Sequence, residues 1–143
     1  MLKNIPSLIS PDLLKVLAEL GHGDRLVIAD ANFPSATMGK NACVIRMDGH
    51  KAIDVAKAIL TLIPLDQYSE TKAMLMDKVP GDETETPIWD EFEALLCSEG
   101  YEPSDLVRVE RQAFYQLARE SALIIATGET ALYGNLILQK GVI

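Results

Sequence analysis

His22 and two carboxylates, Asp24 and Asp30, flank a short apolar run near the start of the chain, and these residue types can carry proton transfer. Imidazole is the side chain whose ordinary pKa lies nearest neutrality, so His22 can donate or accept a proton at cellular pH. The same residue can instead cap a preceding helix, whose dipole favours the charged ring, and spacing alone does not separate the two roles. Asp30 also has a second interpretation, because an Asp at the start of a loop commonly binds nearby backbone amides.

Motifs for other kinds of catalysis are missing from the sequence. Gly21 and Gly23 lack the third glycine of a dinucleotide-binding loop, and neither a phosphate-binding G-x-x-x-x-G-K-S/T sequence nor a G-x-S-x-G motif occurs. His22 and His50 are the only imidazoles, and no H-E-x-x-H spacing accompanies them, so we expect no catalytic metal. General acid–base catalysis is the chemistry that remains.

The scaffold for these side chains is indicated by helical and extended patterns that alternate along most of the chain. Ser10 and Pro11 predict a helix start, and the leucines up to Leu20 repeat at helical spacing, so His22 is expected in a tight joint between this helix and a strand. Further helices are expected over residues 51–63, 86–100 and 112–120, strands over 26–29, 43–46, 72–79, 106–110, 123–126 and 136–138, a long loop over 30–40 and an acidic loop over 80–85. This alternation predicts an α/β three-layer sandwich, with a central mixed or mostly parallel sheet flanked by helices, in a single domain spanning residues 1–143.

Composition narrows the class of partner. The net charge of −8 disfavours nucleic acids and anionic membranes, because both are bound through surplus Lys and Arg. Cys43 and Cys97 match neither a C-x-x-C motif nor a disulfide framework, which is typical of reduced thiols in a cytosolic protein. No apolar run approaches the roughly 20 residues of a membrane span. We therefore expect a soluble cytoplasmic protein that binds a neutral small molecule or another protein.

Several short motifs follow one another along nearly the whole chain. In order they are Leu8-Ile9-Ser10-Pro11, Gly21-His22-Gly23-Asp24, Ala29-Asp30-Ala31-Asn32-Phe33-Pro34, Ile45-Arg46-Met47-Asp48-Gly49, Thr86-Pro87-Ile88-Trp89, Arg111-Gln112-Ala113-Phe114-Tyr115, Thr127-Gly128-Glu129 and Tyr133-Gly134-Asn135, with Lys140-Gly141 close behind. Together they resemble the ribose pyranase/fucose mutarotase family, in its animal-type fucose mutarotase branch. The ordered set is far more specific than any one motif.

Members of that family interconvert the α and β anomers of a monosaccharide, and the resemblance implies L-fucose as the substrate. It implies a proton-transferring role for His22 and sugar-binding roles for Asp30, Arg111, Tyr133 and Asn135, with Gly134 supplying backbone in that turn. It also implies no metal or organic cofactor, and a homo-oligomer built as a ring, often a decamer, with sites near subunit contacts.

Mutarotation needs only proton transfers and positioning, because the hemiacetal opens to an aldehyde that rotates and recloses. A positioned acid–base group typically contributes about 10²–10⁴-fold, which suits a reaction already measurable in water. Whether Tyr133 is a second proton carrier, and whether Asp30 holds a sugar hydroxyl or orients the imidazole, the sequence leaves open.

Three other functions also stay open: a non-catalytic sugar-binding or regulatory module, a ribose pyranase, and a purely structural oligomer subunit. Taken singly, Arg111 can be an ordinary solvated charge and the Tyr133 to Asn135 segment a plain turn. A structural subunit, however, would have no reason to gather Asp30, Arg111 and Tyr133 in one pocket with His22.

Overall fold

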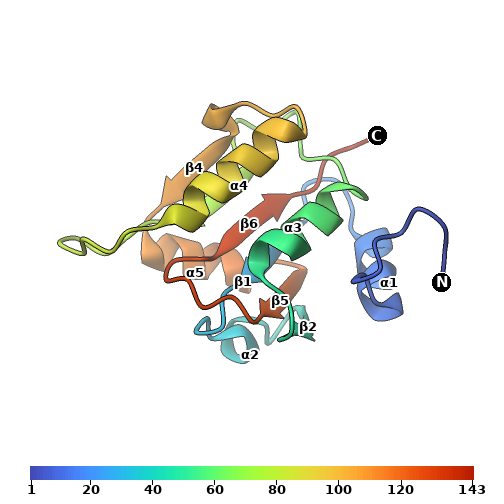
Figure 1. Ribbon diagram of the computed structural model, residues 1–143, viewed down its shortest axis with the longest axis horizontal. Coiled ribbons are helices and arrows are strands. Elements are labelled where there is room, and N and C mark those ends of the chain that lie inside the picture. Colours follow the sequence, from blue (N-terminus) through green and yellow to red (C-terminus); the bar gives the residue numbers. More distant parts are fainter.

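Six strands form one sheet in the computed structural model, which describes residues 1–143, and helices cover both faces of that sheet (Figure 1). The strands are β1 (Arg25–Ala29), β2 (Cys43–Met47), β3 (Ala73–Met76), β4 (Leu106–Val109), β5 (Leu123–Thr127) and β6 (Leu136–Gln139), in the spatial order β2-β5-β1-β6-β3-β4. The helices are α1 (Pro11–Glu19), α2 (Ser35–Met38), α3 (Ala52–Leu60), α4 (Pro87–Ser98) and α5 (Arg111–Arg119), with a 3-10 turn at Pro103–Asp105. The predicted α/β three-layer sandwich is confirmed.

The direction of β6 sets the topology of the sheet. This strand runs antiparallel to both β1 and β3, whereas the three remaining strand pairs are parallel. Five strands therefore point the same way. Their carboxyl ends lie at the same end of the sheet as the amino end of β6.

The central strands are apolar because both of their faces are covered. In β1, the side chains from Leu26 to Ala29 are fully buried, as expected for a parallel strand between two helical layers. Successive side chains point to opposite faces, so Leu26 and Ile28 join one core cluster, whereas Val27 and Ala29 join the other. The same strand thus ties the two halves of the core together.

Each face of the sheet has its own hydrophobic core. Helices α1, α3 and α4 cover one face, where Leu13, Ile59 and Phe92 are among the fully buried side chains. Helices α2 and α5 cover the other face, where Phe114 is fully buried beside Phe33. The loops at the strand ends therefore project from a scaffold that is packed on both sides.

Side-chain caps hold the starts of two of the helices. The Ser10 side chain accepts a hydrogen bond from the amide of Leu13 at 3.2 Å, and Pro11 is the first helical residue of α1. The Glu110 side chain likewise accepts from the amides of Gln112 and Ala113 at the start of α5. The first cap lies at the helix start that the sequence predicts, whereas α5 begins at Arg111, one residue before the expected start.

Two expected elements differ from the structure. The long loop expected over residues 30–40 contains α2, whose single turn is too short to give a periodic sequence pattern. The strand expected over residues 72–79 is shorter, because the chain leaves the sheet after Met76. The Val79 amide lies 3.4 Å from the Tyr133 hydroxyl and does not pair with another strand. No helix combines the length and the apolar character required to cross a bilayer.

Candidate active site

A pocket of about 320 Å³ opens at the end of the sheet where β1 and β3 end and β6 begins. Asp30, Arg111, Tyr133 and Asn135 line it. They come from the loop after β1, the first turn of α5 and the turn before β6. The carboxyl ends of strands are where open α/β sheets commonly bind ligands, so the pocket has the expected place for a site.

Asp30 and Asn135 form a reciprocal pair at the base of the pocket, although 105 positions separate them in sequence. The Asn135 Nδ2 donates to Asp30 Oδ2 at 2.9 Å, and the Asp30 amide donates to Asn135 Oδ1 at 2.8 Å. The Asn32 amide donates to the other carboxylate oxygen at 2.9 Å. Burial raises the pKa of Asp30 from its ordinary value, and these hydrogen bonds oppose the rise without cancelling it.

The Asn135 amide holds both partners in one orientation, because its oxygen and its nitrogen are both engaged with Asp30. A carboxyl fixed in this way presents a defined set of oxygens to a ligand. The pair can therefore recognise hydroxyl groups, which both donate and accept hydrogen bonds.

Tyr133 lies at the pocket in a backbone conformation that is uncommon for a residue with a side chain. Its φ is +58°, in the left-handed region, and its carbonyl accepts a hydrogen bond from Trp89 Nε1 at 3.0 Å. Its hydroxyl donates to Asp82, and this hydrogen bond raises the pKa of Tyr133. Outliers of this kind often mark functional sites.

Gly134 follows Tyr133 at a point where neighbouring atoms approach the backbone closely. A Cβ at this position would lie 3.0 Å from the carbonyl oxygen of Ala131 and 3.1 Å from Cγ of Glu129. The glycine therefore serves close packing of the turn, and it carries Tyr133 and Asn135 into the same pocket.

Arg111 and Tyr115 form the wall contributed by α5. They are one helical turn apart, the Arg111 Nε donates to the Tyr115 hydroxyl at 3.3 Å, and the guanidinium lies 5.5 Å from the ring centre. This hydrogen bond raises the pKa of Arg111, so the side chain is a fixed cation in the pocket wall. Tyr115 also packs against Phe33, with ring centres 5.7 Å apart.

His22 lies at the opposite end of the sheet from this pocket, in the turn before β1. Its Nε2 is 3.0 Å from Oδ1 of Asp66, and its side chain is 46% exposed, whereas that of Asp66 is 6% exposed. Asp66 also accepts from Gln139 Nε2 and from the Tyr68 amide, and these hydrogen bonds, led by that of Gln139, lower its pKa to about 2. Because an ionised carboxylate only accepts hydrogen bonds, Nε2 carries a hydrogen and Nδ1 is left for other chemistry.

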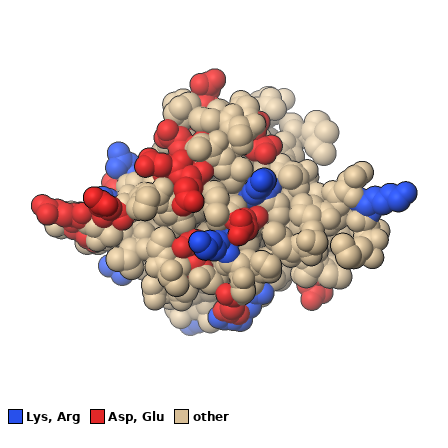
Figure 2. Space-filling view, in the orientation of Figure 1, with Lys and Arg blue, Asp and Glu red and all other residues tan.

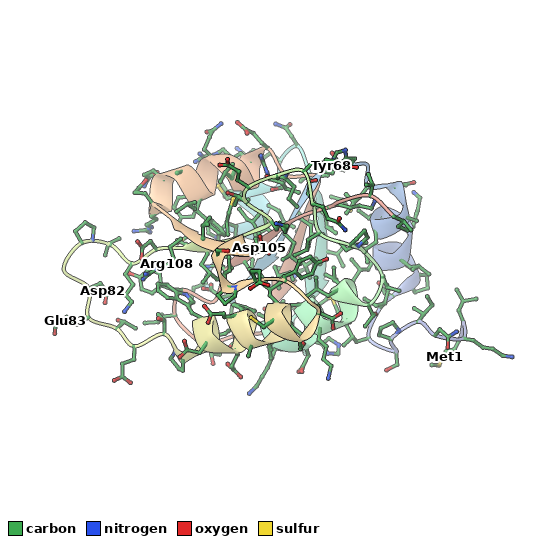
Figure 3. All side chains as sticks on the ribbon, turned by 90° about the horizontal axis from the view of Figure 1, so that it is seen from above. Met1, Tyr68, Asp82, Glu83, Asp105 and Arg108 are labelled. Carbon is green, nitrogen blue, oxygen red and sulfur yellow. The ribbon has the colours of Figure 1, made fainter.

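The two groups of candidate residues are thus separated within one chain. In Figure 3, Tyr68, the neighbour of His22, lies far across the molecule from Asp82 at the pocket. At a rise of about 3.3 Å per residue, β1 alone places His22 and Asp30 roughly 17 Å or more apart. Within one chain Asp30 therefore does not reach the imidazole, whose Nε2 is paired with Asp66.

The sequence missed several residues at these two places. Asp66 and Asp82 had no recognisable motif, since one follows a short Pro-Leu segment and the other sits in an acidic loop. Tyr115 was inside a recognised motif but received no role, although the i, i+4 spacing from Arg111 is a signal that could have linked them. Nowhere in the chain do three or more His, Cys, Asp or Glu side chains converge as a metal site would require.

Comparisons with known proteins agree over the whole chain. The model of the RbsD / FucU transport protein family matches residues 3–143. A protein of Danio rerio named fucose mutarotase is 51% identical over 147 aligned residues, which cover 100% of this chain and 95% of that protein.

Solved structures of similar fold extend the comparison. FucU from Bifidobacterium longum superposes with a TM-score of 0.96 at 54% identity, over 99% of both chains. A fucose mutarotase from Streptococcus pneumoniae, solved in complex with L-fucose, superposes with a TM-score of 0.94 at 42% identity, again over 99% of both chains.

Proposed function

The chain belongs to the RbsD / FucU transport protein family, and from this premise we propose that it is a fucose mutarotase, an isomerase that interconverts the α and β anomers of L-fucose. The observation that carries the proposal is the convergence of Asp30, Arg111, Tyr133 and Asn135 on one pocket from distant parts of the chain. The pocket offers both hydrogen-bond acceptors and a cationic donor, and sugar hydroxyls can pair with either.

The reaction itself requires two proton movements. A proton leaves the anomeric hydroxyl and a proton reaches the ring oxygen, the bond between the anomeric carbon and the ring oxygen breaks, and the aldehyde carbon turns before the ring recloses. His22 carries one of these protons at Nδ1, since Asp66 holds Nε2. A group of this kind typically gives about 10²–10⁴-fold acceleration.

A second copy of the chain completes the site in this proposal. Asp30 and His22 lie at opposite ends of β1. A monosaccharide held at Asp30 therefore lies beyond the reach of the imidazole on the same chain. His22 is half exposed at its own edge and is therefore free to enter a neighbour's pocket. This arrangement supports a homo-oligomer, and a closed ring such as a decamer satisfies it by repeating one head-to-tail contact.

Within the pocket the proposed roles follow from hydrogen-bonding capacity. Asp30, oriented by Asn135, accepts from sugar hydroxyls, and Arg111 donates to sugar oxygens. Tyr133 and Asn135 bind the remaining hydroxyls. No metal or organic cofactor takes part in any of these steps.

Saturation-transfer proton NMR on the anomeric signals of L-fucose tests the proposal. We expect the wild-type protein to accelerate exchange between the α and β signals and the His22→Ala variant to lose that acceleration while still binding fucose. Absence of acceleration by both proteins, with binding retained, would make the chain a sugar-binding module instead. Faster exchange between the pyranose and furanose signals of D-ribose than between the anomers of L-fucose would identify a pyranase.

The absence of a disulfide between the two cysteines bears on where in the cell the protein is found. Cys43 and Cys97 are both exposed and unpaired, which suits a reducing compartment, and the cytoplasm is the location we propose.

A further inference from the structure

Asp82 lies at the rim of the pocket, on the segment between β3 and α4 that the sequence presented as an acidic loop. Figure 3 shows this segment projecting from the body of the molecule, with Asp82 nearer to the body than Glu83. In Figure 2 acidic side chains gather on the same projection. Most of these carboxylates face solvent, but Asp82 is turned towards Tyr133.

We propose that Asp82 is a positioning residue for sugar binding, which fixes the Tyr133 hydroxyl as a hydrogen-bond acceptor towards the substrate. The proposal deepens the function given above, since Tyr133 is one of the residues that bind the sugar there. It also addresses the second role that the sequence left open for Tyr133, that of a proton carrier.

The Tyr133 hydroxyl has a limited capacity for hydrogen bonds. A phenol has one hydrogen and accepts through its oxygen. The hydrogen is given to Asp82 Oδ2, and the Val79 amide lies 3.4 Å from the oxygen as a long donor. Capacity to accept one further hydrogen bond remains on this side chain, which lines the pocket.

Asp82 is itself held in place, so it can impose this orientation. Its second oxygen, Oδ1, accepts from the Thr84 amide at 2.9 Å. The hydrogen bonds from Thr84 and Tyr133 lower the pKa of Asp82 to about 2, so the side chain is an ionised acceptor at neutral pH. An ionised acceptor keeps the phenol hydrogen on Tyr133 and directed away from the substrate.

The other end of Tyr133 is fixed by Trp89. The indole Nε1 donates to the Tyr133 carbonyl at 3.0 Å, and the indole ring has Arg108 at 5.4 Å and Lys78 at 5.6 Å from its centre. The backbone of Tyr133 is thus secured independently of its hydroxyl. Asp82 is the side chain that decides which way the hydroxyl points.

The segment supplies its own control. Glu83 is the next residue, is exposed and takes part in none of these hydrogen bonds. Glu83→Gln removes one negative charge from the same projection, as Asp82→Ala does. A difference between these two variants therefore reports the contact with Tyr133 rather than the charge of the segment.

The test combines a spectroscopic signal with steady-state kinetics on Asp82→Ala, Asp82→Asn and Glu83→Gln. With tyrosine labelled by ¹³C at Cζ, and Tyr133→Phe used for assignment, we expect the Tyr133 signal to move upfield in Asp82→Ala, because the phenol loses a charged acceptor. One neutral hydrogen bond is worth about 0.5–1.5 kcal/mol, so the KM for L-fucose should rise roughly 2- to 12-fold with little change in kcat. Asp82→Asn should recover most of the loss, since its amide oxygen still accepts, and Glu83→Gln should match the wild type.

Three results would overturn the proposal: an unmoved Tyr133 signal in Asp82→Ala, an unchanged KM despite a moved signal, or an Asp82→Asn variant as impaired as Asp82→Ala. The Tyr133 signal and a fucose titration do not depend on turnover. A wild-type protein without anomer exchange would therefore refute the proposed function, while these two measurements still decide the role of Asp82.

Discussion

His22 and Asp30 lie at opposite ends of β1, the first before Arg25 and the second after Ala29. The strand is buried on both faces and cannot bend to bring them together. Each residue nevertheless has an ordered set of partners, Asp66 for the imidazole and Asn135 for the carboxylate. Two prepared half-sites on one chain are the arrangement expected if each pocket joins residues of two copies.

Subunit mixing tests this arrangement directly. We expect His22→Ala and Arg111→Ala to be inactive as separate proteins, because one lacks the proton carrier and the other a pocket donor. After dissociation and reassembly of a 1:1 mixture, random pairing of half-sites should restore about a quarter of the wild-type exchange rate per site. Exchange of L-fucose anomers by NMR measures it.

The outcome separates two geometries. A site contained in one chain would give no recovery, because every copy in the mixture carries one of the two substitutions. Reassembled mixtures of each variant with itself are the matched controls.

Asp66 is expected to control the state of the His22 ring. Replacing Asp66 by Asn removes the ionised acceptor, so the hydrogen on Nε2 is no longer fixed and the ring populates both neutral forms. The kcat for anomer exchange should fall by tenfold or more, as a proton carrier loses part of its typical contribution of about 10²–10⁴. Ring ¹⁵N shifts of His22 should show a mixture of tautomers, and unchanged shifts together with unchanged kcat would contradict the assignment.

Acid should destabilise the fold through Asp66 and Asp82. Both have a native pKa of about 2, below the ordinary value of 3.8, so the unfolded chain binds more protons between these values. Their contribution is complete above about pH 4 and is lost as the pH falls towards 2. Urea unfolding followed from pH 5 to pH 2 should show this loss.

Variants assign the acid effect to its source. Asp66→Asn should make the fall in unfolding free energy between pH 4 and pH 2 shallower, whereas Glu83→Gln should leave the slope unchanged. Asp30 acts in the opposite sense, because burial raises its pKa. Its charged form therefore costs stability as the pH rises above the ordinary pKa of an aspartate, 3.8. A slope that Asp66→Asn does not alter would contradict the linkage.

Gly134 is expected to tolerate no side chain. In Gly134→Ala the new Cβ would meet Ala131 and Glu129 at 3.0 and 3.1 Å, and overpacking of this kind typically costs about 1–3 kcal/mol. Because the turn carries Tyr133, affinity for L-fucose should fall as well. Thermal unfolding and a fucose titration measure the two effects.

Gly49 offers a matched control for this substitution. A Cβ there would have no atom within 4 Å, so Gly49→Ala should change stability by less than about 0.5 kcal/mol and leave fucose affinity intact. Equal effects at both glycines would mean that close packing is not what the turn requires.

Much of this protein was determined by short stretches of sequence. The apolar run of β1 requires cover on both faces, and Ser10 with Pro11 marks a helix start, because caps and periodicity act between neighbours in the chain. These local rules gave the alternation of helices and strands and the layered α/β fold. They did not assign the proposed sugar-binding residues, whose expected roles came from the ordered motifs as a set.

The tertiary structure decided which of these residues meet. Asp30 and Asn135 pair because β6 inserts between β1 and β3 in the antiparallel direction, which brings the start of β6 to the ends of its neighbours. Asp66 reaches His22 across 44 positions, and Asp82 reaches Tyr133 across 51, with no spacing that a sequence pattern can register. Contacts of this kind depend on strand order and on the path of loops over the sheet, which are fixed only when the whole core is packed.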